Sequence, residues 1–271
     1  MIRTILAAIA IFVAPLCAHA QERITAFDAQ IDVRENGDIE VAEAISVIAQ
    51  GASIQRGIYR DLPRFYEKGG ARYPFRYDVK SVTRNGAAEP YAVENDGAAF
   101  RIRIGDADVF IPHGLHRYRI EYEVKNQVRH FESYDEIYWN VTGNFWNFAI
   151  ERASARIVLP GGAAARQTAG YAGRFGATGG AVSYGFADGA HVFSTRRPLA
   201  AGEGLTVAVG FDKGVVAPPS ADDARAEWWA RNASLATLAG AMAAIAFYLV
   251  AAWRRVGVDP PKGPVFARYE P

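Results

Sequence analysis

The feature that most constrains this chain is an apolar stretch without any charged residue, from residue 232 to residue 252. As a helix, its 21 residues are long enough to cross the roughly 30 Å hydrocarbon core of a bilayer. Apolar residues occupy every face of that helix, whereas a surface helix of a soluble domain keeps a polar face. Trp228 and Trp229 before it, and Trp253 after it, stand where interfacial aromatics flank membrane helices. We therefore predict that residues 232–252 span a lipid bilayer.

A second apolar stretch, residues 5–13, lies close to the N-terminus. It is too short to cross a bilayer, and the small residues Ala18 and Ala20 fit the pattern for signal-peptide cleavage. We predict that residues 1–20 are a cleaved signal peptide, in preference to an uncleaved anchor or a lipoprotein signal at Cys17. Cleavage would remove the only cysteine, so the mature chain would hold no disulfide and no thiol nucleophile.

Two independent signals predict the same membrane orientation. A signal peptide places the residues before the span outside the cytoplasm. Basic residues after the span mark the other side as cytoplasmic by the positive-inside rule; these are Arg254, Arg255, Lys262 and Arg268. We expect a protein of the bacterial cytoplasmic membrane, with its N-terminal domain outside and residues 253–271 as a cytoplasmic tail. The chain has 30 basic and 29 acidic residues. This near balance gives no sign of the basic surface with which a protein binds nucleic acid.

The region between the two apolar stretches is typical of an all-β fold. Residues 117–124 alternate apolar and charged side chains, and Asn-Gly and Asp-Gly pairs mark tight turns between such segments. We predict an antiparallel β-sandwich, Ig-like or related, over residues 21–216, as one domain or as two lobes with a boundary near 161–180. Residues 217–231 are predicted to form a linker and a short polar helix, capped by Ser220 or Asp222.

The sequence offers little that resembles a catalytic or cofactor site, and we assign no catalytic, cofactor-binding or metal-binding residue. His113 and His116 are expected on a turn rather than on a helix, where their spacing would suit a metal. One polar cluster could support general acid–base chemistry of a hydrolase, with a solvated loop as the alternative. It contains Glu132, Asp135 and Glu136.

Two segments are more specific than an ordinary strand. Arg56–Pro63 reads RGIYRDLP, and Tyr138–Pro160 begins YWNVTGNFW and ends IERASARIVLP. At these residues the chain resembles the DUF2207 family of predicted bacterial membrane proteins, whose signatures are RGIYRD-P and YWNVTGN-W segments in this order. Residues 257–261 resemble the family's G-DPP element, and the resemblance covers nearly all of residues 21–271.

The resemblance implies a β-rich exported domain and a transmembrane helix, followed by further helices and a low-complexity tail. Because this chain stops at Pro271, we expect it to be a fragment whose span is the first of several. The family is named for its unknown function, so the resemblance carries over no catalytic residue.

Three functions remain open on the sequence alone. The first is an extracytoplasmic module that binds an unknown envelope protein or glycan; the second is a hydrolase; the third is an accessory subunit of a transport or signalling complex. For the first, the recognition surface is predicted on the two motif segments, with core packing as the alternative for Trp139 and Trp146. Its residues are Arg56, Tyr59, Arg60, Asp61, Asn140, Asn144 and Trp146. Motifs that pack together in the core would be structural, whereas motifs that line an exposed groove would form the site.

Overall fold

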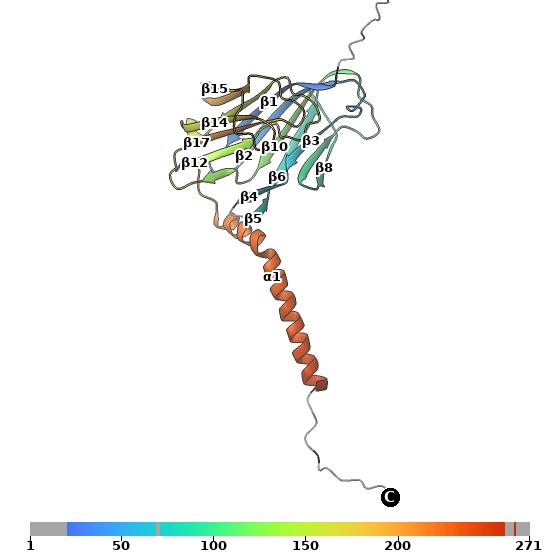
Figure 1. Ribbon diagram of the computed structural model, residues 1–271, viewed down its shortest axis with the longest axis vertical. Helices are drawn as coiled ribbons and strands as arrows, with labels where there is room; N and C mark the ends of the chain where they lie inside the picture. Colours follow the sequence, from blue (N-terminus) through green and yellow to red (C-terminus); the bar gives the residue numbers. More distant parts are fainter. Residues whose placement is uncertain (1–20, 69–70, 258–262, 264–271) are drawn as a thin grey trace, which may run out of the picture. The chain divides into compact units, whose positions relative to one another are not determined.

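The computed structural model describes residues 21–68, 71–257 and 263 of the chain. The predicted signal peptide, with Cys17, and residues 258–262 and 264–271 of the tail lie outside the described residues. The chain is mostly β-strand and has one long C-terminal helix (Figure 1). It divides into two compact units, Met1–Arg64 with Phe75–Pro218, and Phe65–Pro74 with Pro219–Pro271.

The largest sheet of the first unit has eight strands. In spatial order they are β15 (Val182–Ala187), β16 (Ala190–Thr195), β13 (Ala153–Val158), β1 (Arg23–Val33), β2 (Ile39–Ala49), β10 (Gly114–Val124), β6 (Tyr77–Arg84) and β7 (Ala87–Ala88). The pair β1–β13 is parallel, and the other neighbours are antiparallel. The sheet is therefore mixed.

Two smaller sheets complete this unit. One contains, in order, β11 (Val128–His130), β12 (Asp135–Asn140), β17 (Gly204–Phe211) and β14 (Ala165–Gly173). The other contains β3 (Ile58–Pro63), β9 (Ala99–Ile104) and β8 (Tyr91–Asp96), and a short 3₁₀ turn covers Pro160–Gly162. The predicted all-β character is confirmed for the described residues. The finer prediction of an antiparallel, Ig-like sandwich is not confirmed, because the sheets are multiple and the largest one is mixed.

Alternation along the strands builds one core. Phe27 on β1, Ile45 on β2 and Tyr118 on β10 belong to the same buried cluster as Trp139 on β12 and Val207 on β17. On β2 and β10 the residues between the buried ones are mostly more exposed, as the period of two requires, whereas β17, in the middle of its sheet, is buried on both faces.

Charged residues interrupt the buried stripes at two positions. Glu43 stands between the buried Val41 and Ile45 on β2, and it is itself 0% exposed. Arg60 stands between Ile58 and Leu62 on β3 and is 1% exposed. These two positions contain the centre of the candidate site described below.

The second unit consists of a hairpin and the C-terminal helix. The hairpin is β4 (Phe65–Lys68) with β5 (Ala71–Pro74), and β5 contacts α1 (Ala221–Ala252). The helix begins after Ser220, whose hydroxyl accepts a hydrogen bond from Asp223 N at 3.1 Å and so caps it. A π-helical turn, Trp253–Gly257, follows it.

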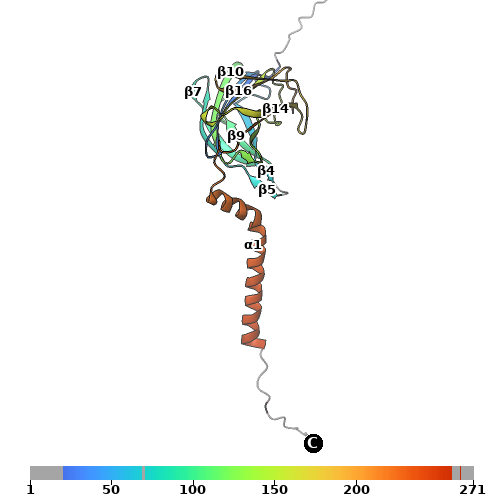
Figure 2. The same cartoon turned by 90° about the vertical axis from the view of Figure 1, so that its left-hand side faces the viewer.

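The polar segment and the apolar segment predicted for the C-terminal region form this one helix. It changes direction after its polar first turns (Figure 2). Arg231–Gly257 is long and apolar enough to cross a membrane, and none of its most apolar stretch is buried in the protein.

Candidate functional site

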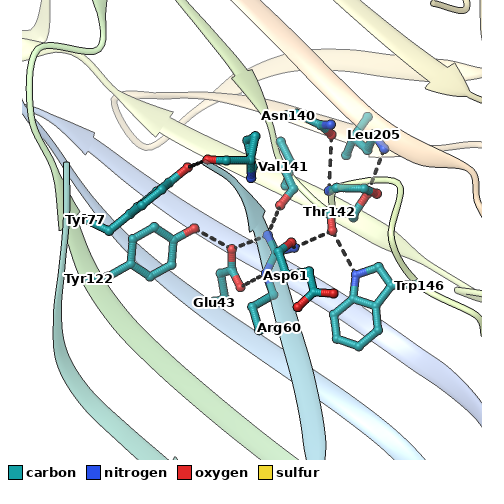
Figure 3. Close-up of polar contacts among 12 residues, drawn as sticks. Glu43, Arg60, Asp61, Tyr77, Tyr122, Asn140, Val141, Thr142, Trp146 and Leu205 are labelled. Carbon is teal, nitrogen blue, oxygen red and sulfur yellow. Dashed lines mark hydrogen bonds and ion pairs between the residues drawn. The ribbon is translucent and has the colours of Figure 1, made fainter. Parts of the chain in front are cut away.

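A buried ion pair lies where the two sequence motifs meet. Arg60 Nε and Nη2 donate to the two carboxylate oxygens of Glu43, each at 2.7 Å. Tyr122 Oη donates to Glu43 Oε1 at 2.6 Å from the neighbouring strand β10. Figure 3 shows the three side chains pointing toward one another. Such a bidentate, charge-assisted arrangement is among the stronger polar contacts in a protein interior.

The same guanidinium joins the first motif to the second. Arg60 Nη2 donates to Val141 O at 2.9 Å, and Nη1 donates to Thr142 O at 2.7 Å. Trp146 Nε1 donates to that same Thr142 oxygen at 2.8 Å. Gly143 has a φ of 72°, and a Cβ there would lie 3.0 Å from Arg60 Nη1. The glycine therefore leaves room for the arginine.

The contacts in this network determine the protonation states of Arg60 and Tyr122. Burial alone would lower the pKa of Arg60, but the adjacent Glu43 carboxylate outweighs it, so that the pKa is raised and the guanidinium stays charged. Burial, followed by the proximity of Glu43, holds the pKa of Tyr122 well above its ordinary value. Tyr122 therefore remains a neutral donor. A network whose charges are paired and whose donors are used holds the fold together rather than transferring protons.

The opposite face of β3 points outward and carries Tyr59 and Asp61. Arg101 on β9 donates from Nε and Nη2 to the two Asp61 oxygens, each at 2.7 Å. It also pairs with Asp96 at 2.7 Å, and its guanidinium lies 5.0 Å from the centre of the Tyr59 ring. The hydrogen bond to Asp61 raises the pKa of Arg101. Arg101 is therefore paired with two carboxylates on this face.

A pocket of about 130 Å³ opens between this outward face and residues 145–148. Its walls combine apolar side chains with a polar rim. They are formed by Ser53, Ile54, Gly57, Ile58, Tyr59, Asp61, Arg101, Phe145, Trp146, Asn147 and Phe148. Residues of both sequence motifs thus line one cavity.

One wall of the pocket is held by Glu22. Its carboxylate accepts hydrogen bonds from the backbone N–H groups of Gln50, Ala52, Ser53 and Ile54 at 2.7–3.2 Å. Burial opposes ionisation of this carboxyl, but the four N–H donors outweigh it and lower the pKa. The loop that supplies Ser53 and Ile54 to the pocket is therefore fixed by a charged group next to the first strand.

The predicted recognition residues fall into three groups. Tyr59 and Asp61 line the pocket, and Arg56 is exposed beside them in sequence, with its guanidinium 4.0 Å above the Phe110 ring. Arg60 forms the second group, because it is buried and is not among the residues that line the pocket. Trp146 is 6% exposed and forms part of its wall.

The two asparagines form the third group, and both shape the turn that leads to Trp146. Asn140 Nδ2 donates to Asn144 Oδ1 at 3.0 Å, and Asn140 Oδ1 accepts from Gly143 N at 3.2 Å. Asn144 Nδ2 donates to the backbone oxygens of Gly173 and Gly202 at 3.1 and 3.3 Å. Both asparagine side chains thus form hydrogen bonds within the protein and hold the turn in place.

Sequence reasoning missed several residues of the site. Glu43 could have been found, because it is the one charged residue in the inward stripe formed by Ile39, Val41, Ile45 and Val47. Arg101 and Phe145 carried no comparable signal. Their importance depends on the pairing of β9 with β3 and on the turn after β12, which bring them close to Tyr59 and Asp61, residues far from them in sequence.

The acidic cluster proposed for a hydrolase does not converge. Asp135 and Glu136 are consecutive in β12, so their side chains leave opposite faces of the sheet. Asp135 is 2% exposed and contacts His130 Nδ1 and Lys213 Nζ, each at 3.0 Å. Burial raises the pKa of Glu136, which Arg129 approaches at 3.8 Å, and Glu132 is exposed in the preceding turn. This cluster gives the hydrolase hypothesis no support.

The paired histidines also diverge. His116 is buried, with Nε2 2.7 Å from Pro112 O, whereas His113 is exposed. Trp139, the other aromatic considered for recognition, is 3% exposed and packs in the core. Within the described ranges, no three His, Cys, Asp or Glu side chains gather in a way that could hold a metal ion.

The fold and its helix define a membrane protein with a β-rich domain and one candidate transmembrane helix. Residues 23–211 match the family described as "Predicted membrane protein (DUF2207) N-terminal domain". This chain belongs to the DUF2207 family.

Similar proteins add little about activity. The chain is 35% identical over 131 residues to "Uncharacterized protein YciQ" of Escherichia coli (strain K12). That match covers 48% of this chain but only 21% of the relative.

Among solved structures, native yeast LTA4 hydrolase matches with a TM-score of 0.45 and 10% identity, over 70% of this chain and 29% of that one. The M1 zinc metallopeptidase of Deinococcus radiodurans matches with a TM-score of 0.39 and 11% identity, over 69% and 42%. Likenesses of this strength carry no argument about the activity of this chain.

Proposed function

We propose that this chain is a membrane-anchored module of the bacterial envelope that binds a protein or glycan outside the cytoplasm. The observation that carries the proposal is the pocket at the junction of the two family motifs. The buried half of the first motif is used to hold the second motif in place, through Arg60. Its outward half, with Tyr59 and Asp61, then borders an accessible cavity. A rigid foundation under a surface cavity is what a binding site requires.

The proposed membrane arrangement assigns successive parts of the chain to the two sides of the membrane. Residues 1–20 would be a cleaved signal peptide, 21–216 the exported domain, and 217–231 the linker with the polar part of the helix. Residues 232–252 would span the bacterial cytoplasmic membrane, and 253–271 would be cytoplasmic. The apolar exposed helix and the basic flank formed by Arg254 and Arg255 support this orientation.

We further propose that the eight-stranded and four-stranded sheets pack as the two layers of a sandwich. The support is that their inward-facing residues, such as Ile45 and Val207, belong to one buried cluster. In this arrangement the three-stranded sheet would lie beside the layers and provide the pocket.

Site-specific photocrosslinking in living cells tests the binding site. A photoreactive phenylalanine would replace Tyr59, which is 56% exposed, or Phe186, which is 57% exposed and lies on β15. A second matched pair is Phe145 and Tyr184, which are 49% and 48% exposed. We expect a discrete adduct from positions 59 and 145, and none from 184 and 186.

The matched exposure makes the comparison decisive. Equal yields at all four positions would indicate unspecific collision and would contradict the proposed site. An adduct confined to 184 or 186 would place the binding surface on β15 instead.

A further inference from the structure

One edge of the three-stranded sheet is open at the pocket. Among the described residues, β3 pairs with β9 only, and the sheet order β3-β9-β8 leaves β3 at the edge. In an antiparallel pair, opposing residues alternate between those that exchange N–H···O bonds and those whose polar groups point away from the partner strand. The register of β3 and β9 therefore determines which backbone groups face the open edge.

Two hydrogen bonds fix this alternation. Arg64 N donates to Ala98 O at 2.8 Å, which continues the β3–β9 register by one more bonded pair. Gly105 N donates to Pro90 O at 2.8 Å, on the β8 side of β9, so the pair Gly57/Gly105 is not a bonded one. The bonded pairs of β3 and β9 are therefore Ile58/Ile104, Arg60/Ile102 and Leu62/Phe100.

The outward groups belong to alternate residues at the pocket. The backbone N–H and C=O groups of Tyr59 and Asp61 point away from β9. Asp61 O accepts from Arg60 Nη1 at 3.2 Å and faces Gly143, where a Cβ would lie 3.5 Å from that oxygen. Within the described chain, the N–H and C=O of Tyr59 and the N–H of Asp61 have no partner. Tyr59 and Asp61 line the cavity together with Gly57, and residues 145–148 form another part of its wall.

We propose that the pocket binds an extended peptide segment, which adds to the edge of β3 at the open N–H and C=O of Tyr59 and the N–H of Asp61. This inference rests on the proposed function and names its ligand class. The donors and acceptors of this edge recur at every second residue, about 6.6–6.8 Å apart, and an extended peptide backbone has the same repeat. Strand addition to an exposed edge is a general mode of peptide recognition, in which adjacent pockets select side chains.

The cavity indicates which side chain the peptide places next to the edge. Its volume of about 130 Å³ is close to that of cavities of roughly 150 Å³ that admit benzene. Arg101 is already paired with Asp61 and Asp96, so the walls present no unpaired charge. A leucine-sized or aromatic side chain, resting against Trp146 and Phe145, fits these conditions.

The first experiment selects ligands on the full chain in lipid nanodiscs. The probes are a displayed library of random ten-residue peptides and, in parallel, a panel of bacterial cell-wall oligosaccharides. We expect peptides with a recurring apolar residue. Binding of the selected peptide is then measured for Tyr59→Pro, Tyr59→Ala and Val93→Pro.

These variants separate backbone from side chain. Proline at position 59 removes the outward N–H and leaves the β9 ladder intact, whereas alanine removes only the side chain. Val93 is 45% exposed, and its N–H points outward from the other edge of the same sheet, so Val93→Pro controls for disturbance of the sheet. We expect Kd for Tyr59→Pro to exceed that for Tyr59→Ala by about tenfold, and Val93→Pro to bind as the unmodified chain does.

A backbone scan of the selected peptide gives a second readout. N-methylation should weaken binding at alternate peptide residues, because only every second N–H of an added strand faces β3. Equal affinities for all methylated peptides, or equal losses in Tyr59→Pro and Val93→Pro, would overturn strand addition. Binding of oligosaccharides alone would also overturn it, while leaving the proposed binding function standing. If no probe binds and no crosslink forms at position 59, both strand addition and the proposed binding function are contradicted.

Discussion

At the scale of single residues, Arg60 joins the buried core to the second motif. It neutralises the buried Glu43 and donates to two backbone oxygens of the second motif. Removal of one partner from a buried ion pair leaves an uncompensated charge and costs about 3–5 kcal/mol. We expect Arg60→Ala to lower the free energy of unfolding by about that amount in urea titrations of the full chain in detergent.

The control for this prediction is Arg103→Ala. Arg103 pairs with Glu94 at 3.1 Å in an exposed setting on β9, where such a pair contributes about 0–1 kcal/mol. Similar losses for the two variants would show that the Glu43–Arg60 pair does not hold the motifs together.

Glu22 makes the stability of the fold depend on pH. Its pKa is lowered from the ordinary value of 4.5 by four backbone N–H donors, although burial opposes them. A depressed pKa in the folded state stabilises the fold above pH 4.5, and this contribution is lost as the pH falls through the folded pKa. We expect Glu22→Gln to be less stable than the natural chain at pH 7 by about 1–3 kcal/mol.

The measurement is the stability difference between the two proteins at pH 7 and at about pH 3. The difference should shrink at the lower pH, because both side chains are then increasingly neutral. Glu132→Gln, at an exposed turn position, serves as the control. A difference that grows on acidification would contradict the assigned direction of the pKa shift.

At the scale of elements, two glycines flank the β3–β9 pair, with Gly57 directly before β3 and Gly105 directly after β9. A Cβ on Gly57, at a φ of 143°, would lie 1.8 Å from Ile104 O. Because neither backbone can yield without breaking the sheet, we expect Gly57→Ala to cost at least about 3 kcal/mol. Gly86→Ala, at a φ of 86° with nothing within 4 Å, should cost only about 1–2 kcal/mol. Thermal unfolding of both variants measures the contrast, and equal losses would contradict it.

The strands were largely predictable, because alternation records which face is buried. Residues 117–124 alternate as expected and lie in β10. Sheet order was not predictable: the parallel pairing of β1 with β13 joins residues over a hundred positions apart, and no local pattern encodes it. The site was predictable only in its motifs. That Tyr59 faces a pocket and Arg60 faces the core depends on which face of β3 is buried.

At the scale of the whole molecule, the proposed orientation can be tested by labelling. Cys17 is the only cysteine, so single cysteines can be introduced on either side of the span. Asp212, with a side chain 76% exposed, lies before the helix, and Val256, 87% exposed, follows its apolar part. In intact cells a membrane-impermeant maleimide should label Asp212→Cys and spare Val256→Cys. The opposite pattern would reverse the proposed topology.

Hydrogen–deuterium exchange tests most directly whether the motif junction is the binding site. The full chain in nanodiscs would be measured alone and with the partner identified by crosslinking at position 59. We predict slower exchange at residues 57–61 and 145–148, which line the pocket, and unchanged exchange at β15. Protection at β15 instead, or unchanged exchange at the pocket at saturating partner, would contradict the account.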